Sequence, residues 1–473
     1  DKGVCIPLTL AEHVTDNITR ITKRIIKLSN TSSTALIYTT TGRFGVGMQN
    51  FTDFVLIRAV SQILKDKNST CPTTISWSQY EADYTALRND IPLVPNHSAG
   101  FLNWDISAIT VQKAKAFKFQ SAHVLALVAC LKWGFRTLEL TSGHPIAVTL
   151  APQYTPAVTS KIYGARYDAT RAATSMDRAI KMVKSAAAHT HYQTLLAQSS
   201  GHLLAARVNF HTKLSNEWRN DHTISNSTFA WAIKACAGLV ATPALRFFRW
   251  KSIPHPACPM GGCQCRVCNL EHILQTCMPR DGQLAALRTL RHNATFPPIT
   301  SFLRKHGTTW HYIGETDCDP PSFLVPKDWK LRVALMTPAN QRPATKPDLI
   351  LASTLSKQAM TIRIVDVQVA WDTSMQAAKA RKESKYAPLQ AIITDMLTQA
   401  GCECPDVKVT PIIIGARGLI PSDWHDTMTE LKLAHAPTQQ LAKTLSTLIL
   451  TKSAHMYFHW DEKCRIIQQA QTR

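Results

Sequence analysis

The sequence is poor in acidic residues. Among its 473 residues, 32 Asp and Glu stand against 53 Lys and Arg, which gives a formal charge of +21. Such an excess of positive charge weakens a compact fold by self-repulsion unless a polyanion is bound, and nucleic acid is the most common polyanionic partner. A basic protein of the membrane surface would need lipid-facing helices or a polybasic block, and the sequence has neither.

No segment has the features of a secretory signal or a membrane span. The start, "DKGVCIPLTL", lacks a basic stretch followed by an apolar one, and the longest apolar run, "HVLALVACLKWGF", is too short and too interrupted to cross a bilayer. The thirteen cysteines are an odd number, which favours a reducing, intracellular location without disulfides. The chain begins in mid-pattern, so we expect it to be a piece of a longer protein.

The length predicts two to four domains, because a chain of this size is too long for one ordinary core. The spacing of Val14, Ile18, Ile21, Ile25 and Leu28 predicts an amphipathic helix near the start. The fold class we expect is multidomain: mainly α at first, then a small zinc knuckle, then an α/β domain. The predicted regions are helices at 1–75, a helical linker at 76–250 (polar and proline-containing over 76–105), a knuckle with a basic helix at 251–310, and the α/β domain at 311–473.

A cysteine-rich segment, "ACPMGGCQCRVCNLEHILQTC", spans residues 257–277. Its C-x2-C pair can direct two thiolates at one metal, and a histidine and a further cysteine follow on an expected helix. Three thiolates and one imidazole form a closed tetrahedral site of the structural zinc type. Cys258 and Cys263 are additional thiols, and Cys263 can replace one of the predicted ligands; unmetallated buried cysteines are the alternative. The predicted zinc ligands are Cys265, Cys268, His272 and Cys277.

The basic helix that follows contains "RTLRHN". Its cationic and polar side chains predict a nucleic-acid contact surface next to the knuckle, whereas the alternative is an ordinary solvated helix face. The predicted contact residues are Arg288, Arg291, His292 and Asn293.

Two acidic residues lie in a pair of expected strands within "KPDLILASTLSKQAMTIRIVDVQVAW". Antiparallel strands of this length can bring Asp348 and Asp366 together at one end of a hairpin. A carboxylate in an apolar strand needs a partner charge, and Mg²⁺ prefers carboxylate oxygens. On the next expected helix, Lys382, Lys385 and Tyr386 share one face. A lysine near a metal-bound water can stabilise phosphorane charge, so the set predicts a phosphodiester-cleaving site; the alternative is a solvated lysine face beside a structural aspartate.

The order "KPD", "VDVQV" and "KESKY" resembles the restriction-enzyme-like PD-(D/E)xK endonuclease of site-specific non-LTR (LINE-type) retrotransposons. Other segments are similar to further parts of the same proteins, in the same order. They are "ALIYTTTGRFGVGMQN" for the reverse-transcriptase thumb, "FAWAIKACAGLVATPALRFFRWK" for the linker, "CRVCNLEHILQTC" for the CCHC zinc knuckle and "RTLRHN" for the run after it.

The resemblance implies a nuclear DNA endonuclease that nicks target DNA for target-primed reverse transcription. It implies that Asp348 and Asp366 hold Mg²⁺, that Lys382 is the catalytic lysine, and that Lys385 and Tyr386 line the site. The implied partners are target DNA, the element's template RNA and the polymerase palm and fingers region. The usual PD-(D/E)xK lysine position holds Gln368, and no polymerase "xADD" motif occurs, so the chain would not copy RNA alone.

Two other functions remain open at this point. In one, the acids are structural, and the chain is a non-catalytic nucleic-acid-binding scaffold that positions a polymerase. In the other, it is a resolvase-type repair nuclease, which would share the PD-(D/E)xK core but would explain neither the knuckle nor the thumb-like start.

Overall fold

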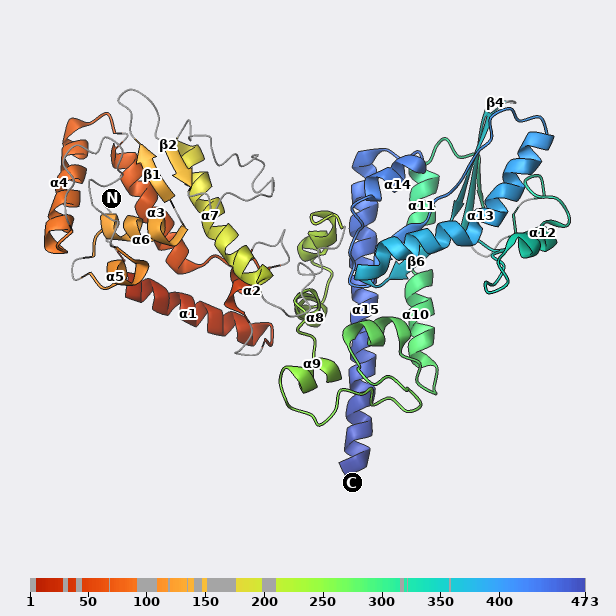
Figure 1. Ribbon diagram of the computed structural model, residues 1–473, viewed down its shortest axis with the longest axis horizontal. Helices are drawn as coiled ribbons and strands as arrows, with labels where there is room; N and C mark the ends of the chain where they lie inside the picture. The colour runs from red at the N-terminus through yellow and green to blue at the C-terminus, as the bar shows by residue number, and fades with distance from the viewer. Residues whose placement is uncertain are drawn as a thin grey trace. The chain divides into compact units, whose positions relative to one another are not determined.

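The protein is a mixed helix-and-sheet molecule, as expected, and its described part forms two compact units, Asp1–Gln198 and Ser199–Arg473 (Figure 1). The boundary between the units lies inside the predicted 76–250 linker. The computed structural model describes residues 6–28, 33–39, 45–67, 69–91, 109–117, 120–133, 135–139, 147–150, 176–197, 210–314, 319–320, 322–356 and 359–472.

In its described residues the first unit is mostly helical, with one antiparallel strand pair that the sequence did not predict. The polar stretch from residue 76 was predicted as linker, but up to Arg88 it continues a helix that begins with Pro72 at its first turn, a position that suits proline. The elements are α1 (Leu8–Ile25), α2 (Thr34–Tyr38), α3 (Phe51–Lys67), α4 (Pro72–Arg88), α5 (Val111–Lys115), α6 (Ala122–Trp133), β1 (Phe135–Glu139), β2 (Ala147–Leu150) and α7 (Met176–Leu196).

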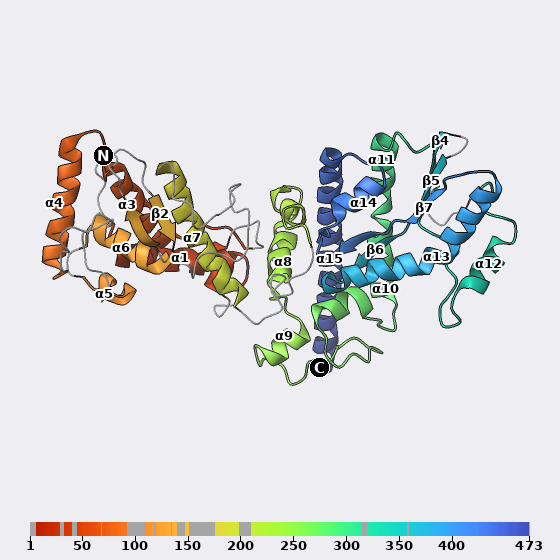
Figure 2. The same ribbon diagram turned by 45° about the horizontal axis from the view of Figure 1, so that its top comes forward.

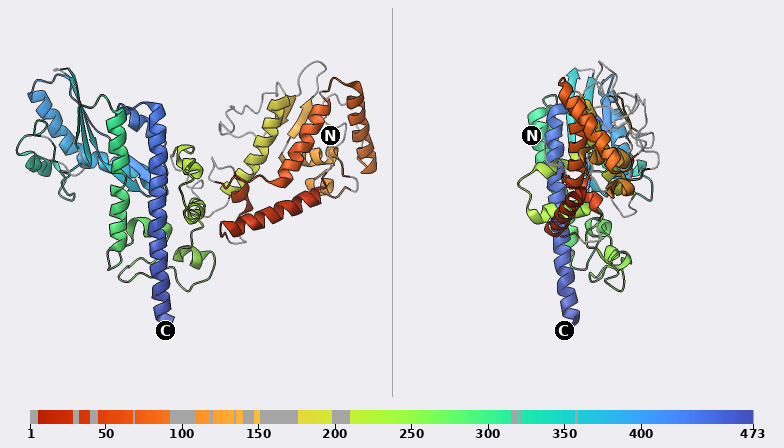
Figure 3. Two further views of the ribbon diagram at one scale, coloured as in Figure 1. Left: turned by 180° about the vertical axis from the view of Figure 1, so that it is seen from behind. Right: turned by 90° about the vertical axis from the view of Figure 1, so that its left-hand side faces the viewer.

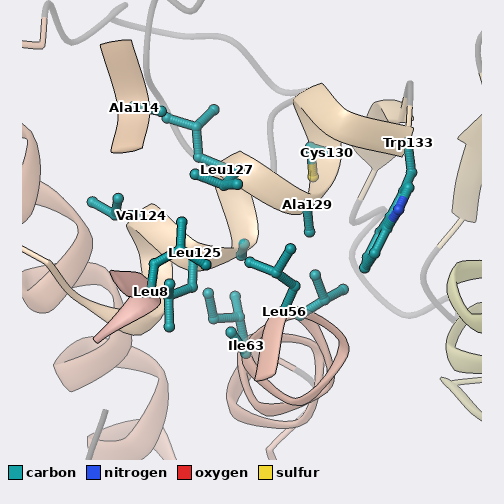
Figure 4. Packing of buried hydrophobic residues seen from close by; sticks show 14 of the residues in the cluster. Leu8, Leu56, Ile63, Ala114, Val124, Leu125, Leu127, Ala129, Cys130 and Trp133 are labelled. Atoms are coloured by element: carbon teal, nitrogen blue, oxygen red, sulfur yellow. The ribbon is translucent and has the colours of Figure 1, made fainter. Parts of the chain in front are cut away.

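The core of the first unit surrounds α6. All residues from Val124 to Cys130 are buried, which is the pattern of a helix enclosed on every side. Figure 4 shows this helix beside Leu56 and Ile63 of α3. The longest apolar run is therefore a core helix, and none of the described helices combines the length and hydropathy needed to cross a membrane.

Helix α1 forms as predicted, but its apolar stripe is not its buried face. Ile21 and Ile25 are 58% and 71% exposed. The buried side of the helix is instead lined by threonines, and Thr15 exchanges a side-chain hydrogen bond of 2.8 Å with Thr52 at the start of α3.

The second unit combines a small sheet with helices on its faces. Its elements are η3 (Leu214–Asn220), α8 (Asn226–Cys236), α9 (Pro243–Phe248), η4 (His272–Thr276), α10 (Gln283–Asn293), α11 (Phe296–His306), β3 (Tyr312–Gly314), α12 (Trp329–Met336), β4 (Leu349–Ser356), β5 (Ala359–Val365), β6 (Val367–Ala370), η5 (Asp372–Ser374), α13 (Met375–Gln399), β7 (Asp406–Val409), β8 (Ile412–Gly415), α14 (Trp424–Glu430) and α15 (His435–Thr472).

The sheet confirms the predicted hairpin and the predicted helix after it. The strand order is β3-β4-β5-β7; β4 and β5 are antiparallel, β5 and β7 are parallel, and β6 and β8 form a second parallel pair. Helix α13 connects β6 to β7 and lies against the sheet (Figure 2). Its Leu389 and Ile393 pack in one core with Ile362 and Ile364 of the strands.

The long helix α15 supports the rest of this unit. Helices α10 and α11 run along it, as seen from behind in Figure 3. Its buried side chains include Leu445, Ile449 and Trp460. This arrangement fixes the start of α10 near the cysteine-rich segment and its end near the sheet.

Candidate active site and metal centre

The two predicted acids face each other at the open end of the β4–β5 hairpin. Leu349 pairs with Val365 in the antiparallel ladder, so Asp348 and Asp366 are the next residues on the two strands. Opposite residues of such a pair project to the same face of a sheet, with Cβ atoms about 5 Å apart. The Val367 N–H donates to Asp348 Oδ2 over 2.6 Å, which holds the first carboxylate against the end of the second strand.

Asp366 is the residue between β5 and β6. Its carbonyl oxygen accepts from the Ile412 N–H at 3.0 Å, so the main chain stays paired with the neighbouring strand at this point. Asp366 is only 3% exposed. A buried carboxylate is costly without compensating charge, and the adjacent helix supplies one.

Helix α13 brings all three of its predicted residues to this end of the hairpin. Lys382 Nζ donates to Asp366 Oδ1 over 2.7 Å. Tyr386, fully buried, donates its hydroxyl to the carbonyl of Lys346 at 2.8 Å, which anchors the chain two residues before Asp348. Lys385 Nζ lies 3.3 Å from the Tyr386 hydroxyl. These side chains converge because positions 382, 385 and 386 share one helix face.

The pKa values of these groups are displaced in opposite directions. Burial raises the pKa of Asp366, the charge of Asp348 raises it further, and Lys382 only partly opposes both. Burial also acts to raise the pKa of Asp348, but His292 and the Val367 N–H outweigh it, so this pKa lies below its ordinary value. The pKa of Lys385 is lowered by burial and then by the charge of Lys382. Opposed shifts within one cluster are typical of sites that bind ions or transfer protons.

His292 joins this cluster, although the sequence predicted it as a nucleic-acid contact. Its Nε2 lies 3.8 Å from Asp348 Oδ1, and its ring packs edge-on against Phe296. The sequence carried no signal for this contact, because His292 lies 56 positions before Asp348 and only the packing of α10 against β6 brings them together.

The other three predicted contact residues of α10 differ in their exposure to solvent. Arg291 is 2% exposed and donates to Ser453 Oγ, the Leu274 carbonyl and Gln275 Oε1 at 2.9, 3.0 and 3.3 Å. Its prediction as a nucleic-acid contact is wrong, because its guanidinium is enclosed between η4, α10 and α15. Arg288 is half-buried and donates to the Cys277 carbonyl at 2.8 Å. Asn293 is exposed, and its predicted contact stays a prediction.

The cysteine-rich segment forms a group of four side chains that could bind a metal such as zinc. Their donor atoms all lie within 4.8 Å of one another. Cys258 Sγ is 3.7 Å from Cys277 Sγ, and Cys263 Sγ is 3.3 Å from His272 Nε2. A tetrahedral zinc with Zn–S bonds of about 2.3 Å separates two sulfur ligands by about 3.8 Å, so the donor set fits that ion. The four residues are Cys258, Cys263, His272 and Cys277.

This set corrects the prediction at two positions. Cys263, the predicted alternative, belongs to the group, and Cys258 joins it in place of the expected pair. Cys265 Sγ contacts the Val267 carbonyl at 3.3 Å instead. Cys268 is fully buried and hydrogen-bonds Cys258, which lowers the pKa of the Cys258 thiol, but it lies outside the four-atom group. No disulfide joins any two of the described cysteines.

A second layer of contacts orients the group and joins it to the sheet. His272 Nδ1 lies 3.0 Å from Thr276 Oγ1, so its Nε2 faces the thiols. Gln275 donates to the Val369 carbonyl of β6 at 3.4 Å. The cysteine-rich segment is thus hydrogen-bonded to β6 through Gln275, and to α10 through the arginine contacts described above.

A cation at the carboxylate pair would have fewer protein ligands. Among the described residues, the cysteine–histidine set is the one group of three or more such potential ligands, and Asp348 and Asp366 are not part of a larger one. Two carboxylates are enough protein ligands for Mg²⁺, because this ion commonly binds one or two carboxylates and keeps several waters.

Comparison with known proteins finds no family model that matches the chain and no significant curated relative.

Proposed function

We propose that this chain is the C-terminal part of a non-LTR retrotransposon protein, and that its second unit is a Mg²⁺-dependent endonuclease that nicks target DNA for target-primed reverse transcription. The observation that carries this proposal is the convergence of Asp348, Asp366 and Lys382 at one end of a β-hairpin. The motif order described above supports the family, and the net charge of +21 supports a polyanionic substrate.

In this proposal Asp348 and Asp366 hold Mg²⁺, which polarises a phosphate oxygen and activates water when bound. Lys382 supplies a fixed positive charge beside Asp366, where it can stabilise charge that develops on the scissile phosphate. Tyr386 keeps the strand entry at Lys346 in place, so its role is to position Asp348. Lys385, whose pKa is lowered, lies on the same face of α13 as Lys382 and Tyr386.

The remaining parts of the proposal concern binding. The cysteine–histidine group holds a structural Zn²⁺ and, with the linker, grips target DNA and template RNA through phosphates rather than bases. The polymerase palm and fingers region of the same protein would copy the RNA, and the site of action would be the nucleus.

The test is a nicking assay on supercoiled plasmid and target duplex in Mg²⁺. Asp366→Asn should lower the nicking rate by on the order of a hundredfold or more, with duplex affinity kept within a few-fold. The matched control is Asp395→Asn, which changes an exposed acid of α13, the helix that carries Lys382, and should nick normally.

A scaffold without catalytic activity is the second candidate. The Lys382–Asp366 ion pair favours it, because such pairs also occur as purely structural features. In that case the parent protein would cleave in neither Mg²⁺ nor Mn²⁺. Unchanged nicking by Asp366→Asn would refute the assignment of the site.

A further inference from the structure

The first unit contains a hollow of about 970 Å³ between α3 and α7. Four cationic side chains line it, and all four are exposed. None of them forms an ion pair with another residue of the part of the chain that the structure describes. They are Arg58 and Lys65 from α3, and Lys181 and Lys184 from α7.

The one carboxylate in the lining does not offset these charges. Asp53 is 5% exposed, and its two oxygens contact Lys132 Nζ at 2.8 Å and His191 Nε2 at 2.6 Å. Burial acts to raise the pKa of Asp53, but the hydrogen bond from His191 and the charge of Lys132 outweigh it and lower this pKa. The carboxylate is therefore ionised and already neutralised, and the hollow presents positive charge to solvent.

Between the cations the lining contains apolar and aromatic side chains as well as polar ones such as Gln49 and Ser61. Phe54 and Met48 are 39% and 40% exposed, and Ile57 and Ile180 contribute further apolar surface. A cationic groove with exposed aromatic surface is the combination that binds single-stranded nucleic acid, because phosphates meet the cations while bases stack on the rings. A duplex turns its base faces inward, so this apolar surface would have no partner in it.

The dimensions suit a few nucleotides. Arg58 and Lys65 are two helical turns apart, which is about 10 Å along α3. Lys181 and Lys184 are one turn apart on α7, which packs against α3. The volume is at the upper end of the roughly 300–1,000 Å³ typical of small-molecule pockets, so it exceeds what a single base requires.

We propose that the hollow between α3 and α7 binds a short single-stranded stretch of nucleic acid, with phosphates on the four cations and a base against Phe54. This proposal does not depend on the nuclease assignment. Its test uses neither duplex nor divalent metal, so its failure would be distinct from failure to nick.

The experiment measures binding of a labelled single-stranded RNA of about 12 nucleotides to the full chain, by fluorescence anisotropy at several salt concentrations. The slope of log K against log salt is about −0.7 for each phosphate neutralised on a single strand. Lys181→Ala/Lys184→Ala should therefore make the slope less steep by about 1.4 and weaken binding at low salt by tenfold or more.

The matched control is Arg20→Ala/Arg24→Ala on α1, which removes the same charge from exposed positions that do not line the hollow. Phe54→Ala should weaken RNA binding by roughly tenfold but leave binding of inorganic polyphosphate unchanged, because polyphosphate has no bases to stack. The proposal is overturned if the Lys181/Lys184 variant keeps the parent slope, if the control loses as much, or if Phe54→Ala leaves RNA binding intact. Thermal unfolding of each variant shows whether lost binding comes from lost folding.

Discussion

Replacing Arg291 with alanine should destabilise the second unit while leaving its affinity for nucleic acid nearly unchanged. The guanidinium donates to the Leu274 carbonyl and Gln275 Oε1 beside the metal-binding group, and to Ser453 Oγ of α15. It therefore joins the knuckle to the long helix that supports the unit. Its exposure of 2% leaves no surface for a phosphate.

The expected loss follows from these contacts. Hydrogen bonds from a charged donor contribute about 1.5–3 kcal/mol each. They do not add in full, because burial of the guanidinium is itself costly and lowers the pKa of Arg291 to about 10. Removing one partner from a buried ionic contact costs about 3–5 kcal/mol, and the three acceptors here are neutral, which argues for the lower end. A loss of about 3 kcal/mol corresponds to a fall in Tm of about 6–12 °C in a domain of this size.

Thermal unfolding by circular dichroism measures the loss, and anisotropy with duplex DNA, well below the transition, measures the affinity. Lys305→Ala, an exposed cation on α11, is the control and should change stability by no more than about 0.5 kcal/mol. Arg291→Lys should fall between parent and alanine variant, because one ammonium cannot reproduce the planar fork. An unchanged Tm with a clear loss of DNA affinity would refute this reasoning and restore Arg291 as a surface contact.

Two further predictions concern the metal-binding group and the acid stability of the first unit. Cys258→Ser should lose bound zinc, whereas Cys265→Ser should keep about one zinc per chain by elemental analysis, because Cys258 belongs to the four-atom group and Cys265 does not. The opposite result would favour the predicted C-x2-C pair as ligands. The carboxyl of Asp53 is harder to protonate in the folded chain than in the unfolded chain, so its stabilisation is present above the unfolded pKa of about 3.9 and is lost as pH falls through the lower folded pKa. Denaturant unfolding from pH 7 downward should therefore show a steeper loss for the parent than for Asp53→Asn in the transition of the first unit, and parallel curves would contradict the assignment.

The candidate active site was largely readable from the sequence because its parts are local. An antiparallel hairpin pairs residues whose numbers have a constant sum, so two acids at corresponding strand ends must meet. The helical period then brings Lys382, Lys385 and Tyr386 to one face. This helix face points toward the acids because α13 connects β6 to β7 and packs on the sheet, and the α/β pattern predicts such a connecting helix.

Which residues form the cysteine–histidine group was harder to predict from the sequence, because six candidate donors lie within twenty residues. Which thiols point inward depends on the path of the loop between them. Gly262, with a φ of +82°, reverses the chain just before Cys263 and turns that thiol toward His272, while Cys265 turns away. A single positive φ in such a short loop leaves no periodic pattern that spacing alone could reveal.

Which side chains of the basic helix α10 are buried also depends on long-range packing. Its sequence looks the same whether Arg291 faces solvent or α15, because a long cationic side chain suits both environments. In the same way, the apolar stripe of α1 predicts a helix but not which side is buried, and the threonine side packs against α3.

The positions of α1 and α13, the β4–β5 hairpin, the meeting of the two acids and the presence of a thiol-rich segment that could bind a metal thus follow from patterns within a few tens of residues, because backbone periodicity is a local property. The contact of His292 with Asp348, the burial of Arg291 and the hollow between α3 and α7 arise only in the folded chain. His292 and Asp348 lie 56 positions apart in the sequence, and Arg291 and Ser453 lie 162 positions apart. More than a hundred residues separate α3 from α7, the two helices that line the hollow. Such contacts depend on the packing of whole elements, which no short segment encodes.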